Sequence, residues 1–229
     1  IVLPGSSVRG ALRSRASRIA RTILAARRAP VEDWSDTDVH AQLAGDPVLV
    51  RDLFGSTEQH GALTVLDTLA VPGSSRLIPH NAGDRWTGGV AGGALYGEEV
   101  HDAQWGEMTL ELNPSSFSPR ADADRRRAAW CLLGLVLAEL AAGALPLGTR
   151  GLGQVEVTGI RVEGGPSLGV EDWELAAPSQ DGGAGAGLAG QILDRLRSVN
   201  KGIAASPGAG DDWTGWSSYL CDHEEARDE

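Results

Sequence analysis

Apolar residues near the start of the chain recur at helical spacing. Val8, Leu12, Ala16, Ile19 and Ile23 share one face, which predicts an amphipathic helix. The turn-forming pair Pro-Gly stands just before this helix, and we expect one of the two serines that follow the pair to cap it.

The segment Asp122–Ala142 carries the strongest helical pattern in the chain. It is polar at its start and almost wholly apolar from Ala128 onward, so this helix should lie buried between other layers, with Gly143 as its stop. Before it, Glu107–Leu112 alternates between polar and apolar residues, which predicts a strand with one buried face.

Shorter patterns predict three more helices and two more strands. The helices are expected at Thr37–Leu43, Asp46–Phe54 and Leu188–Val199. The strands are expected at Leu63–Leu66 and Gly153–Glu163. In the second of these strands the alternation shifts by one residue, which predicts a bulge at Gly159.

Three glycine-rich or polar stretches lack such patterns. Residues 71–94 are interpreted as a long protruding loop or hairpin, and a loop of that length inside a compact domain usually carries function. Residues 179–189 are interpreted as a linker. The acidic tail with Trp213, Trp216 and Tyr219 is expected to be either a docking peptide or a frayed end.

The elements follow the order helix, strand, loop, strand, helix, strand. One further strand ahead of Ile1 would complete β-α-β-β-α-β, the ferredoxin-like arrangement of the α+β class. The only methionine is Met108, so we expect that sequence preceding Ile1, with this first strand, is missing. One domain is expected over residues 1–177, and the linker, short helix and tail over 178–229.

Charge is distributed unevenly along the chain. The formal net charge is −11, yet residues 1–30 contain seven arginines and no acid, which leaves −18 for the remainder. Such a basic segment can still bind phosphate locally, because salt confines its field to roughly 10 Å. Two cysteines allow neither a disulfide framework nor a zinc cluster, and the longest apolar run is too short to span a bilayer. A reducing cytoplasm is therefore the expected compartment.

Two stretches are candidate phosphate-binding sites. In Leu3–Arg15 a glycine turn leads into a helix whose first N–H groups suit a phosphate. Arg9 and Arg13 lie within a turn or two and can bind neighbouring phosphates. The alternative is a capped surface helix with solvated arginines. In Leu145–Val155 three glycines surround Arg150, which favours an anion-binding nest, although such glycine-rich turns are common between a helix and a strand.

Four motifs occur in order along the first two thirds of the chain. They are Leu3–Arg15, Leu53-Phe54-Gly55-Ser56, Asp84-Arg85-Trp86-Thr87-Gly88-Gly89 and Leu147–Val155. Together, over residues 3–163, they resemble the RAMP superfamily (repeat-associated mysterious proteins) of CRISPR effector complexes. The nearest likeness is to the backbone subunits of type III complexes.

The resemblance implies a modified ferredoxin-like, RRM-related fold that binds CRISPR RNA along its sugar-phosphate backbone in a multi-subunit antiviral complex. Target RNA and other RAMP subunits are the further partners that it implies, with no membrane. It implies a thumb-like insertion at about 71–104, in which Asp84 pairs with Arg85 or Arg85 faces the RNA. The RNA-binding residues would be Ser6, Ser7, Arg9, Arg13, Arg85, Arg150 and Gly151. The residues themselves agree on the mode of binding, because two Phe and two Tyr are too few for the base-stacking sheet of an ordinary RRM.

The sequence leaves open whether the chain cuts RNA. Relatives that cleave target RNA use an aspartate ahead of the Pro-Gly-Ser-Ser turn, which here would lie before Ile1, and only in that case is a divalent metal ion the expected cofactor. No zinc is expected, because residues 29–52 lack the cysteines that some relatives carry there. His80 is interpreted as a polar loop histidine, and Asp46 and Asp52 as solvated surface acids.

Three functions follow from this reading. The leading hypothesis is a guide-RNA-binding subunit. The alternatives are a metal-dependent target-RNA endonuclease of the same family, and a scaffold or capping subunit that docks other proteins through its tail.

Overall fold

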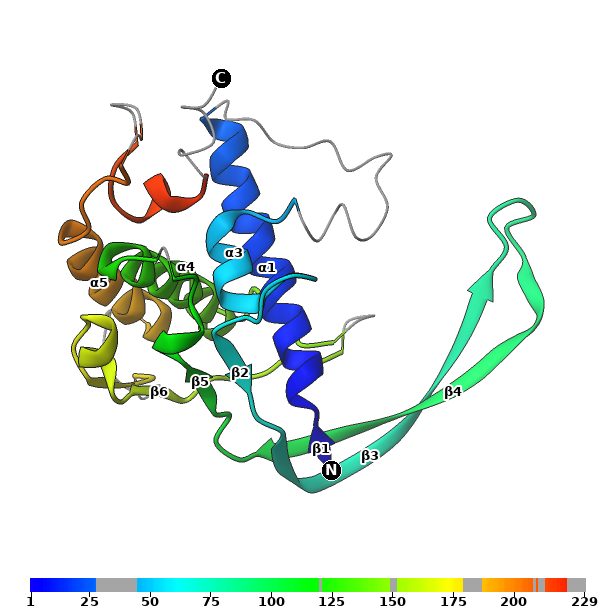
Figure 1. Cartoon of the computed structure of the whole chain (residues 1–229). Coiled ribbons are helices and arrows are strands. Elements are labelled where there is room, and N and C mark those ends of the chain that lie inside the picture. The colour runs from blue at the N-terminus through cyan, green and yellow to red at the C-terminus, as the bar shows by residue number, and fades with distance from the viewer. Residues whose placement is uncertain are drawn as a thin grey trace.

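The computed structural model describes residues 1–27, 45–119, 121–148, 152–178, 187–207, 209 and 213–221. These residues form an α+β body from which a long two-stranded arm projects to one side (Figure 1). The helices are α1 (Gly5–Ala26), α3 (Val48–Phe54), α4 (Ala123–Ala141) and α5 (Leu188–Lys201). The strands are β1 (Val2–Leu3), β2 (Leu63–Val65), β3 (Thr68–Gly83), β4 (Val90–Trp105), β5 (Leu110–Leu112), β6 (Gly159–Val162) and β7 (Trp173–Ala176). Three short 3-10 helices are η1 (Pro114–Ser116), η2 (Gly165–Leu168) and η3 (Gly215–Tyr219).

Helix α4 lies at the centre of the body. Its N-terminus is capped by Asp122, whose carboxylate accepts the backbone N–H of Arg125 at 2.7 Å. Most of its residues from Ala128 onward are buried, as the apolar run predicts. At Gly134 an added Cβ would lie 2.5 Å from Leu196 Cδ2 of α5, so this glycine lets the two helices pack closely.

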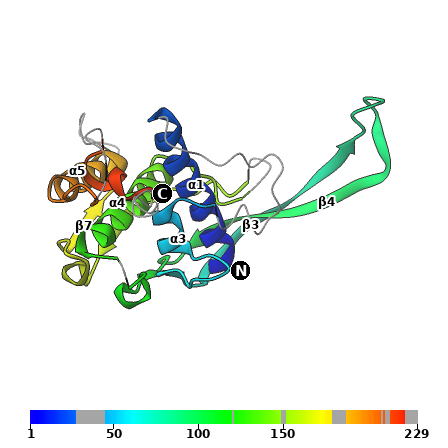
Figure 2. The same ribbon diagram turned by 45° about the horizontal axis from the view of Figure 1, so that its top comes forward.

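Helix α1 lies between α4 and the arm, an arrangement that both views show (Figures 1 and 2). Its buried stripe is Val8, Leu12, Ala16, Ala20 and Leu24. The predicted serine cap is wrong. Pro4 occupies the N-cap position, with no side-chain cap, and Ser6 and Ser7 lie exposed in the first turn. Proline, with φ fixed near −65°, suits the start of a helix and needs no N–H there.

All strand pairs among the described residues are antiparallel. β2 pairs with β5 inside the body, and the chain continues from them into the arm, where β3 and β4 pair along most of their length. β1 pairs only with the first residues of β3, Val2 opposite Leu69. Of the two alternatives for residues 71–94, a loop or a hairpin, the structure has the hairpin, which extends beyond the predicted bounds with two strands of 16 residues each. The α+β class and the antiparallel pairing are those of the expected modified ferredoxin-like fold.

Two sequence predictions near the C-terminus need correction. The strand predicted over Gly153–Glu163 is paired only from Gly159 to Val162, in regular register with β7, so Gly159 begins the strand and forms no bulge. The described end of the tail is packed against α4 through η3, with Tyr219 and Leu220 at 5% and 1% exposure. It is therefore part of the core and neither a frayed end nor a free docking peptide.

Other predictions fall where no structure is described. The helix expected at Thr37–Leu43 lies outside the described residues, as do most of the predicted linker and residues 222–229. Along the described chain, no helix combines the length and the apolar character that a membrane span needs.

Candidate nucleic-acid interface

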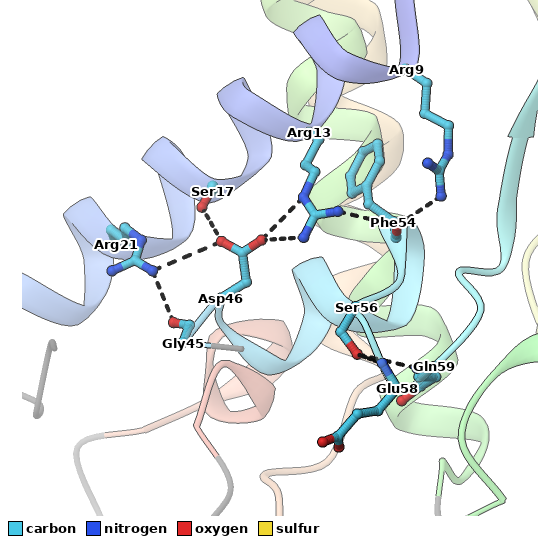
Figure 3. A network of polar contacts seen from close by, with 10 residues as sticks. All are labelled: Arg9, Arg13, Ser17, Arg21, Gly45, Asp46, Phe54, Ser56, Glu58 and Gln59. Carbon is cyan, nitrogen blue, oxygen red and sulfur yellow. Dashed lines mark hydrogen bonds and ion pairs between the residues drawn. The ribbon is translucent and has the colours of Figure 1, made fainter. Parts of the chain in front are cut away.

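Three arginines of α1, Arg9, Arg13 and Arg21, lie in an internal polar network (Figure 3). Arg9 donates from Nη2 to the carbonyl oxygen of Phe54 at 2.7 Å and from Nε to that of Leu63 at 3.2 Å. Arg13 also reaches the Phe54 carbonyl, at 3.4 Å. These cations thus hold the C-terminal end of α3, where the helix dipole favours positive charge. Burial, and secondarily the charge of Arg13, lower the pKa of Arg9.

Asp46 is the acidic centre of this network. Its carboxylate accepts hydrogen bonds from Arg13 at 2.7 Å and from the Ser17 hydroxyl at 2.7 Å. Arg21 lies 3.8 Å from the same carboxylate and donates to the carbonyl of Gly45 at 2.8 Å. Asp46 is only 6% exposed, so the prediction of a solvated surface acid is wrong.

Asp52 is buried in the same way. Its two carboxylate oxygens accept Nε and Nη2 of Arg125 at 2.7 and 3.0 Å, a two-point ion pair between α3 and α4. The residue is fully buried. Both carboxylates are paired with arginines and support the packing of α3, so Asp52 too is not the solvated surface acid that was predicted.

The Leu-Phe-Gly-Ser motif comprises the last two residues of α3 and the turn that follows it. Gly55 has a φ of +75°, and an added Cβ would lie 2.7 Å from the carbonyl oxygen of Gln59. The Ser56 hydroxyl accepts the backbone N–H groups of Glu58 and Gln59, both at 3.2 Å. Because Arg9 binds the Phe54 carbonyl in this motif, two of the four sequence motifs are structural partners of each other.

The N-terminus of α1 already has a negatively charged partner. The N–H of Gly5 donates to Asp67 Oδ1 at 2.7 Å. An added Cβ on Gly5 would lie 2.1 Å from the carbonyl oxygen of Val65, so glycine is needed for this close approach. Asp67 thus occupies the position where the sequence pattern placed a phosphate, and it leaves the exposed hydroxyls of Ser6 and Ser7 as the polar groups of that turn.

Asp84 organises the tip of the arm. Its carboxylate accepts the N–H of Trp86 at 3.0 Å and the hydroxyl of Thr87 at 2.8 Å. Its backbone N–H and carbonyl are bonded to Gly89 and Gly88, each at 2.8 Å. The hydrogen bond from Trp86, and then that from Thr87, lower the pKa of Asp84. Asp84 therefore has the structural role that was expected, but its partners are Trp86 and Thr87 and not Arg85.

Arg85 and Trp86 form an exposed pair at this tip. The guanidinium carbon of Arg85 lies 5.3 Å from the centroid of the Trp86 ring, a cation–π contact. Trp86 is 85% exposed, the highest value among the large apolar side chains that the structure describes as exposed. The sequence reasoning named Arg85 and missed Trp86. A tryptophan in a tight turn between two strands cannot reach the core. Its position inside the Asp-Arg-Trp-Thr-Gly-Gly turn could therefore have indicated an exposed ring.

The glycine-rich loop is described only at its base. The N–H of Leu147 donates to the carbonyl of Gly153 at 2.9 Å. Gly153 has a φ of +76°, and an added Cβ would lie 2.2 Å from the N of Gly148. These two glycines therefore let the two ends of the loop touch. Arg150 and Gly151 lie outside the described residues.

Comparison with known families matches residues 1–156 to the RAMP superfamily. A search of curated proteins finds no significant match. The matched part runs from β1 through α4 and includes the arm, and it covers more than half of the chain. The chain therefore belongs to the RAMP superfamily.

Proposed function

We propose that this protein is a guide-RNA-binding subunit of a type III CRISPR effector complex, in which it holds the RNA by its sugar-phosphate backbone. Membership of the RAMP superfamily supports an RNA-binding role in a multi-subunit complex. The observation that carries the proposal is the exposed Arg85–Trp86 pair in the turn between β3 and β4. This turn is the far end of the arm that projects from the body (Figure 1).

The chemistry of the tip fits single-stranded RNA. An exposed tryptophan offers a face on which any base can stack, and such contacts are worth about 1–3 kcal/mol each. An adjacent arginine supplies the charge for a neighbouring phosphate. The hydrogen bonds of Asp84 order the short loop that carries both residues before the RNA arrives, so less backbone entropy is lost on binding.

The first turn of α1 provides a second contact in this proposal. Ser6 and Ser7 are exposed there, and Arg9 is half-buried with its Nε and Nη2 used by backbone carbonyls. We assign the Nη1 edge of Arg9 to a phosphate, together with the two serine hydroxyls. Arg13 is held by Asp46 and shares the Phe54 carbonyl with Arg9, which leaves Arg9 as the main cation of this contact. Arg150 and Gly151 also remain in the proposal as RNA-binding residues.

The test is the salt dependence of binding to a single-stranded RNA of arbitrary sequence, measured by fluorescence anisotropy. Arg85→Ala should weaken binding and reduce the log–log salt slope by about one unit. Trp86→Ala should weaken binding by about tenfold with the slope unchanged, because stacking releases few counterions. Arg195→Ala, an exposed arginine on α5, is the matched control and should bind like the parent protein.

The Arg9→Ala variant requires a second readout. Since Arg9 also holds the end of α3, its unfolding free energy must be measured beside its RNA affinity. A weaker affinity in a variant that is still fully folded supports the phosphate contact. Parent-like binding by both tip variants would overturn the proposal and favour the scaffold function.

A further inference from the structure

Two residues, Leu66 and Asp67, connect strand β2 of the body to strand β3 of the arm. The first residue of β3, Thr68, is only 3% exposed, whereas most of the strand beyond it is exposed. The arm therefore begins inside the body. Its direction depends on the contacts that the residues around this connection make with the rest of the chain.

Asp67 binds the start of helix α1 from this connection. Its Oδ1 accepts the backbone N–H of Gly5, the first residue of the helix, at 2.7 Å. The two segments also touch through their backbones, because an added Cβ on Gly5 would lie 2.1 Å from the carbonyl oxygen of Val65. Asp67 thus links the residue next to Ser6 and Ser7 to the residue that precedes the arm.

Strand β1 makes the second attachment between α1 and the arm (Figure 1). It pairs with the first two residues of β3, and the N–H of Ala70 donates to the carbonyl oxygen of Ile1 at 3.0 Å. Only Pro4 separates β1 from α1. A ladder this short can act as a hinge, whereas a second bond on the other side of Pro4 restricts rotation about it. We call these two attachments, β1 with β3 and Asp67 with Gly5, the arm joint.

Cross-strand contacts brace the arm beyond the joint. The His80 ring stacks on Tyr96 with 5.2 Å between centroids, and its Nε2 lies 3.0 Å from Oε2 of Glu98. His80 lies within β3, so its prediction as a loop histidine is wrong. Nearer the base, the Ser74 hydroxyl donates to the Asp102 carboxylate at 2.9 Å. These contacts favour motion of the arm as one piece about its joint.

The length of the arm magnifies any rotation at the joint. Strand β3 has 16 residues, and at about 3.3 Å per residue its ends are up to roughly 50 Å apart. A rotation of about 10° at the base of an arm that long moves its tip by roughly 9 Å. One hydrogen bond at the base can therefore decide where the tip lies relative to α1.

We propose that Asp67 is a positioning residue that holds the arm at a fixed angle to α1 and thereby sets the span between the two RNA contacts. The inference rests on the proposed function, which places one contact at the tip and the other on the first turn of α1. Two contacts at a fixed span bind one RNA strand with a high effective concentration, and this advantage falls when the span varies. Asp67 itself touches no RNA in this proposal.

A distance measurement between two spin labels on the RNA-free protein tests the joint by itself. The labels are attached at the exposed positions Ser14→Cys on α1 and Val90→Cys beside the tip, in a Cys221→Ser background, since Cys131 is buried. Asp67→Ala should at least double the width of the distance distribution. Asp67→Asn keeps an Oδ1 acceptor and should retain the parent width. A parent-like width for Asp67→Ala, or equal broadening in both variants, would overturn the proposal.

The matched control for this measurement is Asp194→Ala. It removes a carboxylate of α5, which lies on the side of the body away from the arm (Figure 1). Its distance distribution should equal that of the parent protein. Broadening equal to that of Asp67→Ala would refute a specific role for Asp67.

A double-mutant cycle with a single-stranded RNA of about 16 nucleotides tests the consequence for binding. Asp67→Ala should weaken binding about tenfold while the tip is intact, and should have no effect in the Arg85→Ala/Trp86→Ala background, where one contact remains. Asp67→Asn should bind no more weakly than the parent protein. Equal weakening in both backgrounds would overturn the positioning role. Tighter binding by Asp67→Ala would also overturn it, because the carboxylate would then act only by repelling phosphate.

The two measurements separate this inference from the proposed function. If the parent protein does not bind the RNA, the proposed function fails, and the distance distributions still decide whether Asp67 holds the arm. If the parent binds and the distributions of parent and Asp67→Ala are the same, the positioning role alone fails.

Discussion

Asp46 is the carboxylate that three residues of α1 share. Arg13, Ser17 and Arg21 all point to it, and it lies between the packed surfaces of α1 and α3. The free-energy cost of burying this carboxylate away from water is offset only while its hydrogen-bonding and ion-pair partners are present. The cationic face of α1 is therefore largely a structural feature.

Replacing this carboxylate should destabilise the fold strongly. Asp46→Ala leaves the half-buried guanidinium of Arg13 without its ion-pair partner, and we expect a loss of about 3–5 kcal/mol in the free energy of unfolding. Urea denaturation followed by tryptophan fluorescence measures it. Asp194→Ala, which breaks the exposed pair with Arg197, is the matched control and should cost less than about 1 kcal/mol. Equal losses in the two variants would contradict the buried-network interpretation.

Sequence reasoning found the residues of this network but not their partners. Arg9 and Arg13 stood out as charges off the apolar stripe, which is correct. Their acceptors, Asp46 and the Phe54 carbonyl, lie more than thirty positions away, and no local pattern links them. The N-terminus of α1 was predicted to be open to a phosphate for the same reason. Asp67, which accepts the N–H of Gly5 there, follows β2 in the sequence, far from the helix.

At the scale of elements, the arm is separable from the body. Beyond Thr68 none of its described residues belongs to the buried core. Its two strands bond to each other and, at the base only, to β1. The arm should therefore add little to global stability.

Excising the arm tests this separation. Replacing residues 72–103 by Asn-Gly joins Val71 to its partner Gln104 through a two-residue turn that suits an antiparallel hairpin. We expect the unfolding free energy to change by less than about 1 kcal/mol, because no core contact is removed. Urea denaturation and circular dichroism measure it. A loss of several kcal/mol would show that the arm supports the body.

The elements that sequence predicted best are those with local start and stop signals. α4 was predicted within one residue at each end, because Asp122 caps it and Gly143 ends it. β7 was missed, since Trp173–Ala176 is short and is defined by its pairing with β6. The strand over Gly153–Glu163 was predicted too long, because alternation continues where pairing does not.

For the whole molecule, the hydrophobic core extends past the part that matches the RAMP superfamily. α5 packs against α4, and η3 contributes Tyr219 and Leu220 to the same core. The acidic composition of the tail favoured a prediction of solvent exposure. Tyr219 and Leu220, which are buried, stand among charged residues, so the sequence pattern did not reveal their burial. The burial of this segment depends on its packing against α4, which is distant in the sequence.

The titration of Tyr219 reports whether the C-terminal segment is packed. Burial, reinforced by the charges of Asp122 and Asp124, raises its pKa from 10.0 to about 12. A raised pKa means that the neutral phenol favours the folded state below pH 10, and that this contribution is lost as the pH rises through about 12. Since the chain has two tyrosines, the ultraviolet titration of the Tyr96→Phe variant isolates Tyr219. A pKa equal to that of the urea-unfolded chain would contradict the packed arrangement.

The irregularity between Pro72 and Ser75 in β3 has a consequence for how such arms vary among related chains. Here two residues, Gly73 and Ser74, face the single residue Asp102, and Ser74 is bonded to its carboxylate at 2.9 Å. One extra residue reverses which side chains of β3 point to each side beyond it. Gain or loss of a single residue in β3 before Leu77 would therefore exchange the sides of the arm on which Leu77 and Ile78 lie. Inherited length changes that preserve both faces must come in steps of two residues per strand, so that the arm lengthens by whole repeats of its pleat.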